Sequence, residues 1–427
     1  MDYIEAIKFL ESLPSPKEWD LAVPKRLAEL SGALPISATT IHITGTNGKG
    51  SVASFVSSIL LSAGHSVGTY TSPHLLNYHE RIRINGTDVS DDEFSEAVSS
   101  IIPFMAQMED EGKTPSQFEA LTIAALLIFK KHNVSFLVLE VGMGGRLDAT
   151  NIIDAKIAII TNVEKEHTES LGKTVSKIAF EKSGIIKQGA LVVTAASGSA
   201  LNEITKRCDE KNAKLFALGK NIVAKERSVS EEKTVFDYEG VNLKCENLEL
   251  SLLGRHQIAN ASCAIGAIEC LRSLGTDVSD SAMRKGLLNA KWPGRLEVVS
   301  KKPILLLDGA HNPSGMEALK TALKEIFISK NRNLILVLGI LSDKEYGIML
   351  NTISPLASKI ILTKPETERA ANPELLASFL PNKNVEIIEN VGNAIERALA
   401  LASEDGIICV SGSLYTVADA KRHLQGI

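Results

Sequence analysis

The sequence predicts an α/β protein of two domains, each built on a mostly parallel sheet. Short apolar runs rich in Val and Ile alternate with helix-length segments, which is the pattern of parallel strands covered on both faces. The runs are TTIHIT, SFLVLEV, AKIAIIT, ALVVTA, PILLLD, LILVLG, KIILT and GIICVS. The 427 residues also exceed the roughly 300 at which a single core stops growing, so two cores are expected.

The order of these patterns predicts where the domains divide. We assign residues 1–296 to a first domain of the phosphate-loop ATPase type, because it contains the glycine-rich segment ITGTNGKGS between a predicted strand and a predicted helix. Residues 297–427 are assigned to a smaller Rossmann-like domain with four strands. Residues 215–253 alternate around a Tyr-Glu-Gly turn, which indicates antiparallel hairpins that close the first domain. A helix is expected over residues 256–274. The Pro293–Gly294 pair then breaks any regular structure, and we place the boundary there.

The composition excludes several classes of partner. A net charge of −5 gives no basic surface of the kind that nucleic-acid binding needs. No apolar stretch reaches the roughly 18 residues of a membrane span, and the start MDYIEAIKFLESL lacks the basic and apolar regions of a secretory signal. The five cysteines are scattered without C-x-x-C spacing, which argues against disulfides and zinc. We therefore expect a cytoplasmic protein that binds small molecules. A monomer is also expected, although nothing in the composition decides the oligomeric state.

The segment ITGTNGKGS, residues 43–51, lies between a predicted strand and a predicted helix. It departs from the standard phosphate-binding loop G-x-x-x-x-G-K-[ST], because Ile43 replaces the first glycine and Gly50 replaces the hydroxyl residue. The hydroxyl comes one residue late, at Ser51. Backbone N–H groups at such a turn favour an anion, and Lys49 can reach outer phosphates. A glycine-rich turn without a ligand remains the alternative.

Other polar residues follow apolar runs, where the ligands of parallel sheets bind. Glu140 ends FLVLE and suits Mg²⁺, although a solvated acid fits the same position. His167 follows AKIAIIT, where a lone histidine more often has a structural role. Asp308 ends PILLLD and could accept hydrogen bonds from ribose hydroxyls, while Arg295 could pair with phosphate oxygens. Lys182, in IAFEKSGII, has the pattern of a solvated lysine on a helix.

Taken together and in this order, the motifs resemble the folate branch of the Mur ligase family, the folylpolyglutamate synthases and bifunctional dihydrofolate synthases. The matching words are GTNGKGS, YTSPHL with ERIRING, FEALTIAA, LEVGMGGRLDATN, EKSGIIK, HQIANA, PGRLE, LDGAHNP and GSLY, and they span nearly the whole chain. In that family the loop is G-T-x-G-K-x-[ST], so the late hydroxyl is the family's own form. The resemblance implies an ATP-dependent ligase that adds L-glutamate to the glutamate tail of tetrahydrofolates through an acyl phosphate.

The resemblance also implies roles for particular residues. ATP would be bound by Thr46, Asn47, Gly48, Lys49, Gly50, Ser51, Asn260, Arg295 and Asp308. Mg²⁺ would be ligated by Ser72, Glu140 and His167. The folate substrate would lie near Phe118, Glu119, Leu147 and Asp148. The residues expected to be catalytic are Lys49, Lys182 and His311, with Lys182 carrying an N-carboxylate (a carbamate).

The chemistry of such a ligase requires two anions to meet, a carboxylate and a triphosphate. Mg²⁺, Lys49, the loop amides and Arg295 can offset their repulsion, and positioning supplies most of the rest. The metal residues lie in the first predicted domain, whereas the nucleotide residue Asp308 lies in the second and Arg295 lies on the segment between them. Closure across a hinge near residues 293–297 is therefore expected.

Three alternatives remain beside this interpretation. A bifunctional enzyme that also makes dihydrofolate from dihydropteroate and glutamate would carry the same motifs. A cell-wall Mur ligase would carry a nucleotide-sugar-binding domain before the loop, and the 44 residues that precede Gly45 are too few for one. A P-loop switch protein would need base-reading and switch elements that the sequence does not show, and it would leave the second domain without a role.

Overall fold

The computed structural model describes residues 1–14, 19–328 and 332–426. The chain divides into two compact units, and each is assembled from three separate stretches of sequence. The first contains Met1–Lys225, Asp237–Leu248 and Ala259–Ala290, and the second contains Glu226–Phe236, Glu249–Ile258 and Lys291–Ile427. The chain enters the second unit for the last time at Lys291, close to the domain boundary predicted after residue 296.

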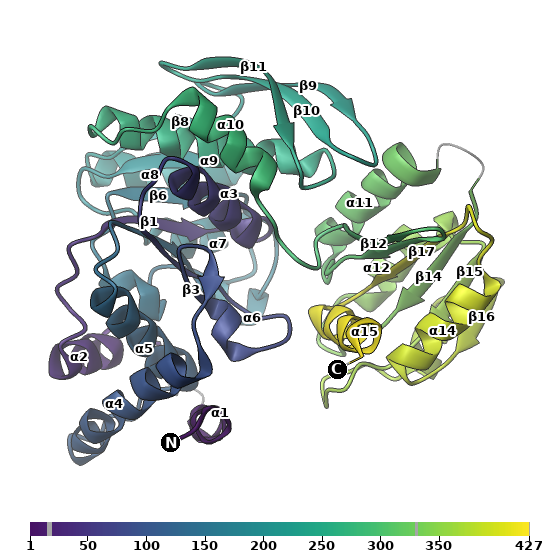
Figure 1. Ribbon diagram of the computed structural model, residues 1–427, viewed down its shortest axis with the longest axis horizontal. Helices are drawn as coiled ribbons and strands as arrows, with labels where there is room; N and C mark the ends of the chain where they lie inside the picture. The colour runs from purple at the N-terminus through teal and green to yellow at the C-terminus, as the bar shows by residue number, and fades with distance from the viewer. Residues whose placement is uncertain (15–18, 329–331, 427) are drawn as a thin grey trace. The chain divides into compact units, whose positions relative to one another are not determined.

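The first unit is built on a mostly parallel sheet with the strand order β4-β3-β2-β5-β1-β6-β7-β8 (Figure 1). Its strands are β1 (Thr39–Thr44), β2 (Val67–Tyr70), β3 (Ile82–Ile84), β4 (Thr87–Asp88), β5 (Phe136–Glu140), β6 (Ile157–Ile160), β7 (Leu191–Thr194) and β8 (Lys214–Ala217). Strands β2, β5, β1, β6, β7 and β8 are parallel, and β3 and β4 form an antiparallel edge. The four apolar runs assigned to this domain are confirmed as β1, β5, β6 and β7.

Helices connect these strands and supply the rest of the unit. They are α1 (Tyr3–Ser12), α2 (Ala22–Ser31), α3 (Lys49–Ser62), α4 (Asp91–Asp110), α5 (Gln117–Lys131), α6 (Thr168–Leu171), α7 (Val175–Ser183), α8 (Gly198–Glu210) and α10 (Asp280–Asn289), with the 3₁₀ turns η1 (Tyr78–Arg81) and η2 (Ala149–Ile152). Helix α9 (His256–Ser273) begins in the second unit and continues in the first. Within the described parts of the chain, no helix combines the length and hydropathy that a membrane span requires.

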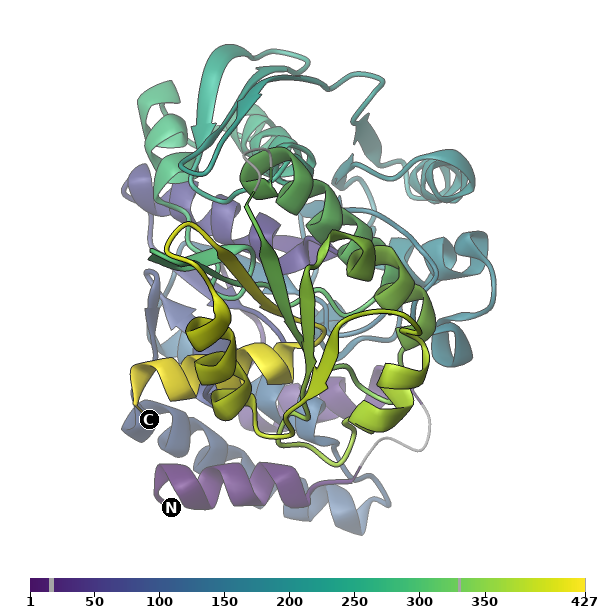
Figure 2. The same ribbon diagram turned by 90° about the vertical axis from the view of Figure 1, so that its right-hand side faces the viewer.

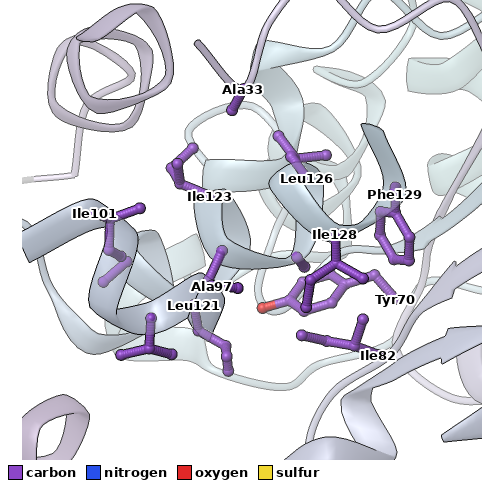
Figure 3. Packing of buried hydrophobic residues seen from close by; sticks show 14 of the residues in the cluster. Ala33, Tyr70, Ile82, Ala97, Ile101, Leu121, Ile123, Leu126, Ile128 and Phe129 are labelled. Carbon is purple, nitrogen blue, oxygen red and sulfur yellow. The ribbon is translucent and has the colours of Figure 1, made fainter. Parts of the chain in front are cut away.

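Helix α5 lies in an apolar cluster with α4 and the ends of β2 and β3. Figure 3 shows Ile128 and Phe129 of α5 beside Tyr70 and Ile82. The Tyr70 hydroxyl lies 3.3 Å from Thr122 Oγ1, also on α5, so the ring is buried while its polar end is hydrogen-bonded. This packing fixes the carboxyl end of β2, which leads into the candidate site.

Helices α3 and α10 approach each other backbone to backbone. Gly286 lies at the contact, where an added Cβ would be 2.4 Å from the Cα of Ile59. No side chain fits in that space, so the close approach requires glycine at this position. Helix α3 follows the predicted phosphate loop, and α10 therefore supports that helix directly.

The antiparallel region is a separate sheet with the order β11-β10-β9. Its strands are β9 (Val223–Val229), β10 (Thr234–Glu239) and β11 (Lys244–Leu250), which confirms the hairpin around the Tyr-Glu-Gly turn. The prediction was wrong for residues 215–217, which belong to β8 at the parallel edge of the large sheet. An edge strand is partly exposed, so its alternating pattern resembles that of a hairpin strand.

The second unit contains a sheet with the order β12-β13-β17-β14-β15-β16 (Figures 1 and 2). Its strands are β12 (Glu297–Lys301), β13 (Ile304–Leu307), β14 (Leu334–Leu338), β15 (Lys359–Leu362), β16 (Val385–Ile387) and β17 (Ile407–Ser411). Strand β12 is antiparallel to β13 and the other pairs are parallel. The helical elements are α11 (Pro313–Ala322), the π-helical turn η3 (Leu323–Phe327), α12 (Tyr346–Ile353), η5 (Ser354–Leu356), α13 (Pro373–Ser378), α14 (Val391–Leu401) and α15 (Leu414–Gln425).

The prediction of four strands in this sheet was too low. Strands β12 and β16 were not predicted, because neither contains a buried apolar run. Regular structure resumes at Glu297, immediately after the predicted break. Both are edge strands of the sheet, where one side has no partner strand and side chains stay partly exposed.

Candidate active site

Four neighbouring strands carry the predicted metal and phosphate residues of the first unit to one edge of its sheet. Strands β2, β5, β1 and β6 are adjacent and parallel. Ser72 follows β2, Glu140 ends β5, the loop Gly45–Gly48 follows β1, and His167 lies beyond β6. Because the carboxyl ends of parallel strands meet at the same edge, residues far apart in the sequence converge there.

The loop after β1 has the geometry of a phosphate-binding turn. Helix α3 begins at Lys49, and its N-cap Gly48 has φ 84° with no side-chain cap. Lys49 Nζ donates to the carbonyl oxygens of Gly45 and Thr46, at 3.2 and 3.4 Å. Asn260 of α9 packs against Gly48, since a Cβ there would lie 2.2 Å from Asn260 Oδ1. The structure thus brings together Lys49, Gly48 and Asn260, all predicted nucleotide residues.

Two amides of the loop serve to hold it in place. Thr46 N donates to the carbonyl of Asn162 at 2.9 Å, and Asn47 N donates to Asn162 Oδ1 at 2.8 Å. Asn162 was not among the residues predicted from the sequence, although it directly follows the run AKIAIIT. The assignment of Thr46 and Asn47 as nucleotide-contacting residues stays a prediction, and the amides at the start of α3 are better placed for an anion.

Glu140 is a buried carboxylate beside this loop. It is 3% exposed, and Ser72 N donates to its Oε2 at 3.3 Å, so two of the three predicted metal residues are in contact. His167 is exposed, has φ 50°, and accepts from Ser170 N and Leu171 N through its carbonyl. In the described part of the chain, no group of three or more His, Cys, Asp and Glu side chains is arranged to hold a metal ion. The predicted set contains only two such residues, Glu140 and His167, and its third member is Ser72.

Lys182 is buried, and the interpretation of its local sequence as a solvated lysine was wrong. It is 4% exposed, because α7 turns it inward on the same face as Ile178 and Ala179. Its Nζ donates to the carbonyl of Gly45 at 2.7 Å, the oxygen that also accepts from Lys49. Burial, followed by the charge of Lys49, lowers the pKa of Lys182 from its ordinary value to about 7.

The two predicted folate residues at the start of α5 differ in their contacts. Phe118 packs over Gly142, where an added Cβ would lie 2.6 Å from the ring, and its centroid is 6.1 Å from that of Tyr70. Glu119 accepts from Ser116 N and Ser116 Oγ, both at 2.7 Å, and forms the capping box of α5. Its carboxylate therefore stabilises a helix end, and burial raises its pKa.

Asp148 holds the glycine-rich loop that follows β5. It is 2% exposed and accepts from Met143 N and Thr150 N, both at 3.0 Å, and burial raises its pKa. Thr44 Oγ1 donates to the carbonyl of Gly144 at 2.6 Å and ties the same loop to β1. Leu147 lies half-buried next to Asp148. The contacts of Asp148 organise the loop, and a contact of Asp148 or Leu147 with the folate remains a prediction.

In the second unit, the predicted residues gather at the turn after β13. Asp308 Oδ2 accepts from Leu296 N and its Oδ1 accepts from Ala310 N, both at 2.9 Å. His311 Nδ1 lies 2.8 Å from the carbonyl of Gly309, and a Cβ at Gly309 would lie 3.0 Å from Arg295 Nη1. Arg295, Asp308 and His311 therefore form one cluster, in which the Asp308 carboxylate braces the backbone.

The edge of the first sheet has the chemistry that a polyphosphate and a divalent cation need. Lys49 and the uncapped N-terminus of α3 favour negative charge. Glu140 provides a carboxylate oxygen, the ligand type that Mg²⁺ prefers. The residues present therefore fit both groups.

Comparison with known families gives two matches that together cover most of the chain. The Mur ligase middle domain matches residues 43–268, and the Mur ligase glutamate ligase domain matches residues 294–414.

Individual proteins are similar over nearly the full length. The dihydrofolate synthase/folylpolyglutamate synthase of Bacillus subtilis (strain 168) is 35% identical over 400 residues, 90% of each chain. The structure of Escherichia coli FolC in complex with DHPP and ADP is 31% identical with a TM-score of 0.90, covering 100% of this chain and 98% of that one. A bifunctional folylpolyglutamate synthase/dihydrofolate synthase with Mn, AMPPNP and L-glutamate bound is also 31% identical, with a TM-score of 0.88 and the same coverage.

Proposed function

Because the chain belongs to the Mur ligase family, in the branch of the dihydrofolate synthase/folylpolyglutamate synthases, we propose that it joins L-glutamate to the glutamate tail of a tetrahydrofolate. It is an ATP-dependent carboxylate–amine ligase. The observation that carries the proposal is the convergence of Lys49, Lys182 and Glu140 at one edge of the sheet.

The reaction has two steps, because direct amide formation from a carboxylate is uphill in water. A carboxylate oxygen of the folate attacks the γ-phosphorus of ATP, the bond to the bridging oxygen breaks, and ADP leaves. The amine of glutamate then attacks the acyl carbon, inorganic phosphate departs, and the amine nitrogen gives up a proton. Both products of ATP, ADP and phosphate, are therefore formed once for each amide bond.

Lys49 and the amides at the start of α3 are proposed to orient the phosphates of ATP. Glu140 and Ser72, with His167, would hold a divalent cation, taken here as Mg²⁺, which shields the repulsion between carboxylate and triphosphate when bound. Asn260 is proposed to contact the nucleotide from α9, since it already packs on Gly48. Arg295, Asp308 and His311 remain predicted nucleotide-binding and catalytic residues of the second unit.

Lys182 is proposed to react with CO₂ and become a carbamate. A neutral amine nitrogen attacks CO₂, and one proton is released. A pKa near 7 supplies the neutral amine at physiological pH. The carbamate nitrogen keeps one N–H, so it can still donate to the carbonyl of Gly45. The product replaces a buried neutral amine by an anion, which suits a neighbouring divalent cation.

The carbamate can be tested apart from catalysis. Enzyme equilibrated with ¹³CO₂ should show a carbamate carbon signal that is missing in Lys182→Ala and retained in Lys177→Ala, which removes an exposed lysine of the same helix. Lys182→Ala should also lose most activity and regain part of it with acetate or formate. A signal that persists in Lys182→Ala would refute the assignment.

The ligase function is tested by the substrate dependence of ADP release. Release should require both tetrahydrofolate and glutamate, because the acyl phosphate forms only on bound folate. Equal release without folate would instead support a nucleotide-hydrolysing switch protein. Lys49→Ala, which removes the ammonium group at the loop, should abolish the folate-dependent release.

A bifunctional enzyme is a second candidate, favoured by the double name of the Bacillus subtilis relative. It predicts ADP release with dihydropteroate plus glutamate at a rate comparable with that for tetrahydrofolate plus glutamate. Absence of release with dihydropteroate would leave the folylpolyglutamate synthase function alone.

We also infer a cytoplasmic monomer. The support for the compartment is that Cys208, Cys245, Cys263, Cys270 and Cys409 are all buried free thiols, as expected of a reducing environment. Light scattering after size exclusion should give the mass of one chain, and a concentration-dependent mass would contradict the monomer.

A further inference from the structure

The loop after β1 is held from outside, by the segment that follows β6. As described above, Asn162 accepts the amides of both Thr46 and Asn47, one through its carbonyl and one through its side chain. The carbonyl oxygen of Asn47 is also bound, because it accepts a hydrogen bond from Thr161 Oγ1 at 2.6 Å. Both polar groups of the Asn47 backbone are therefore bound by two consecutive residues.

The side chain of Asn162 has a fixed orientation. Its Nδ2 donates to Glu164 Oε1 at 3.2 Å, which leaves Oδ1 to face the amide of Asn47. Glu164 N donates to Thr46 Oγ1 at 3.0 Å, so the two segments are joined in both directions. A side-chain amide satisfied at both ends keeps its position better than one held at a single end.

The two segments also touch with little space between them. An added Cβ on Gly45 would lie 1.8 Å from Thr161 Oγ1. Thr161 N donates to the carbonyl of Thr44 at 2.9 Å, which fixes this approach. The path of the loop before Gly48 is thereby determined by residues outside it.

We infer that Thr161 and Asn162 are positioning residues for the nucleotide phosphates. They hold the backbone at Asn47, so that the amides from Gly48 to Ser51 converge where the phosphates bind. The inference rests on the proposed function, because it requires the loop to bind the phosphates of ATP. Neither residue needs to contact the nucleotide itself.

The test compares ADP binding to wild type, Asn162→Ala and Thr161→Val by calorimetry. Asn162→Ala should bind ADP about tenfold more weakly, because the Asn47 amide loses its acceptor. Thr161→Val keeps the shape of the side chain and removes one hydrogen bond, and it should bind ADP about threefold more weakly. It also keeps the test decisive if Asn162→Ala folds poorly.

Two readouts separate positioning from a general structural defect. The KM for ATP should rise with the Kd for ADP, while the KM for the folate stays unchanged. Adenosine, which has no phosphate, should bind wild type and both variants equally.

A matched control exists in another turn of the same unit. Asn221 Oδ1 accepts from Ala217 N at 2.6 Å, and its Nδ2 donates to the carbonyl of Leu215 at 3.1 Å. This is the same kind of clamp, after β8 instead of at the phosphate loop. Asn221→Ala should leave ADP binding unchanged, and an equal loss in Asn221→Ala would overturn the inference.

Lys49→Ala distinguishes the failure of this inference from the failure of the proposed function. If Lys49→Ala loses ADP while Thr161→Val and Asn162→Ala keep wild-type affinity, only the positioning role is overturned. If wild type and Lys49→Ala bind ADP equally, the loop does not hold the phosphates and both proposals fall together.

Discussion

The turn after β1 and the turn after β13 both connect a strand to a helix, and they are stabilised differently. Each follows a buried strand and leads into a helix, α3 or α11. In the turn after β13, Asn312 caps α11 by accepting from Gly315 N at 2.8 Å, and Asp308 accepts from two amides. In that turn, side chains of the turn itself accept the hydrogen bonds of the backbone amides.

The turn after β1 has the opposite arrangement. Its helix carries no side-chain cap, and both backbone polar groups of Asn47 are bound from outside the turn, by Thr161 and Asn162. A side chain that caps a helix uses the amides that an anion would otherwise bind. Two strand-to-helix turns therefore need not have the same ligand chemistry, because the source of the stabilising groups decides which amides remain for a ligand.

Among substitutions in the turn after β1, that of Gly48 should have the largest effect on activity. In Gly48→Ala, the new Cβ would displace Asn260, and φ 84° is strained for alanine. We expect kcat/KM for ATP to fall by about 100-fold or more, because the phosphates lose their position. Gly64→Ala is the control, since Gly64 has φ 86° with no atom within 4 Å of an added Cβ. It should lose about 1 kcal/mol of stability and no activity.

A wild-type kcat/KM for ATP in Gly48→Ala would contradict this prediction. A similar loss of activity in Gly64→Ala would point to strain alone.

Lys182, which binds the turn after β1, should make the free energy of unfolding of the protein depend on pH. Its pKa is lowered to about 7 in the folded protein, so the unfolded chain binds more protons between pH 7 and 10.5. Stability must then rise with pH in this window. Relative to Lys182→Met, wild type should gain about 1.4 kcal/mol per pH unit from pH 7 to 10, measured by denaturant unfolding without metal or CO₂. Parallel curves for the two proteins would contradict the burial of a neutral amine, and Lys177→Met should follow wild type.

Removing Asp308 tests whether the second turn supports itself. Asp308→Ala leaves the amides of Leu296 and Ala310 without their acceptor, and we expect a loss of about 3 kcal/mol in unfolding free energy. Asp405→Ala, an exposed acid of the same unit, should change stability by less than about 0.5 kcal/mol. If the KM for ATP rises while stability is unchanged, Asp308 serves the nucleotide and not the turn.

Removal of the helix cap in the turn after β13 should have the smallest effect on stability. Asn312→Ala removes the acceptor of Gly315 N and should cost about 1 kcal/mol, whereas Asn312→Asp keeps a capping oxygen and should cost much less. Equal losses in the two variants would show that the cap contributes little.

The central strands and the phosphate loop could be predicted because their signals are local. β5 and β13 are mainly apolar, β1 is rich in the β-branched residues Thr and Ile, and Lys49 follows a glycine-rich turn. β12 could not be found in this way, because an edge strand after Pro293 and Gly294 carries no apolar run. The sequence also could not reveal Asn162, since its place beside the loop depends on β6 pairing with β1.

Lys182 is a different case, because a local signal was present. It lies four residues after Ile178 and three after Ala179, and this spacing places all three on one face of a helix. The apolar neighbours of Lys182 favoured burial of its side chain, whereas the charge of its ammonium group favoured exposure. The structure shows that burial prevailed, and the lowered pKa is the electrostatic consequence.

The backbone contact between α3 and α10 has a consequence for motion. With no side chain at Gly286 to absorb a displacement, helix α3 cannot shift toward α10 without carrying it along. Nucleotide held at the start of α3 would therefore restrain both helices as one rigid body. Amide hydrogen exchange along Asp280–Asn289 should slow when ADP binds, even though α10 supplies no predicted contact to the nucleotide.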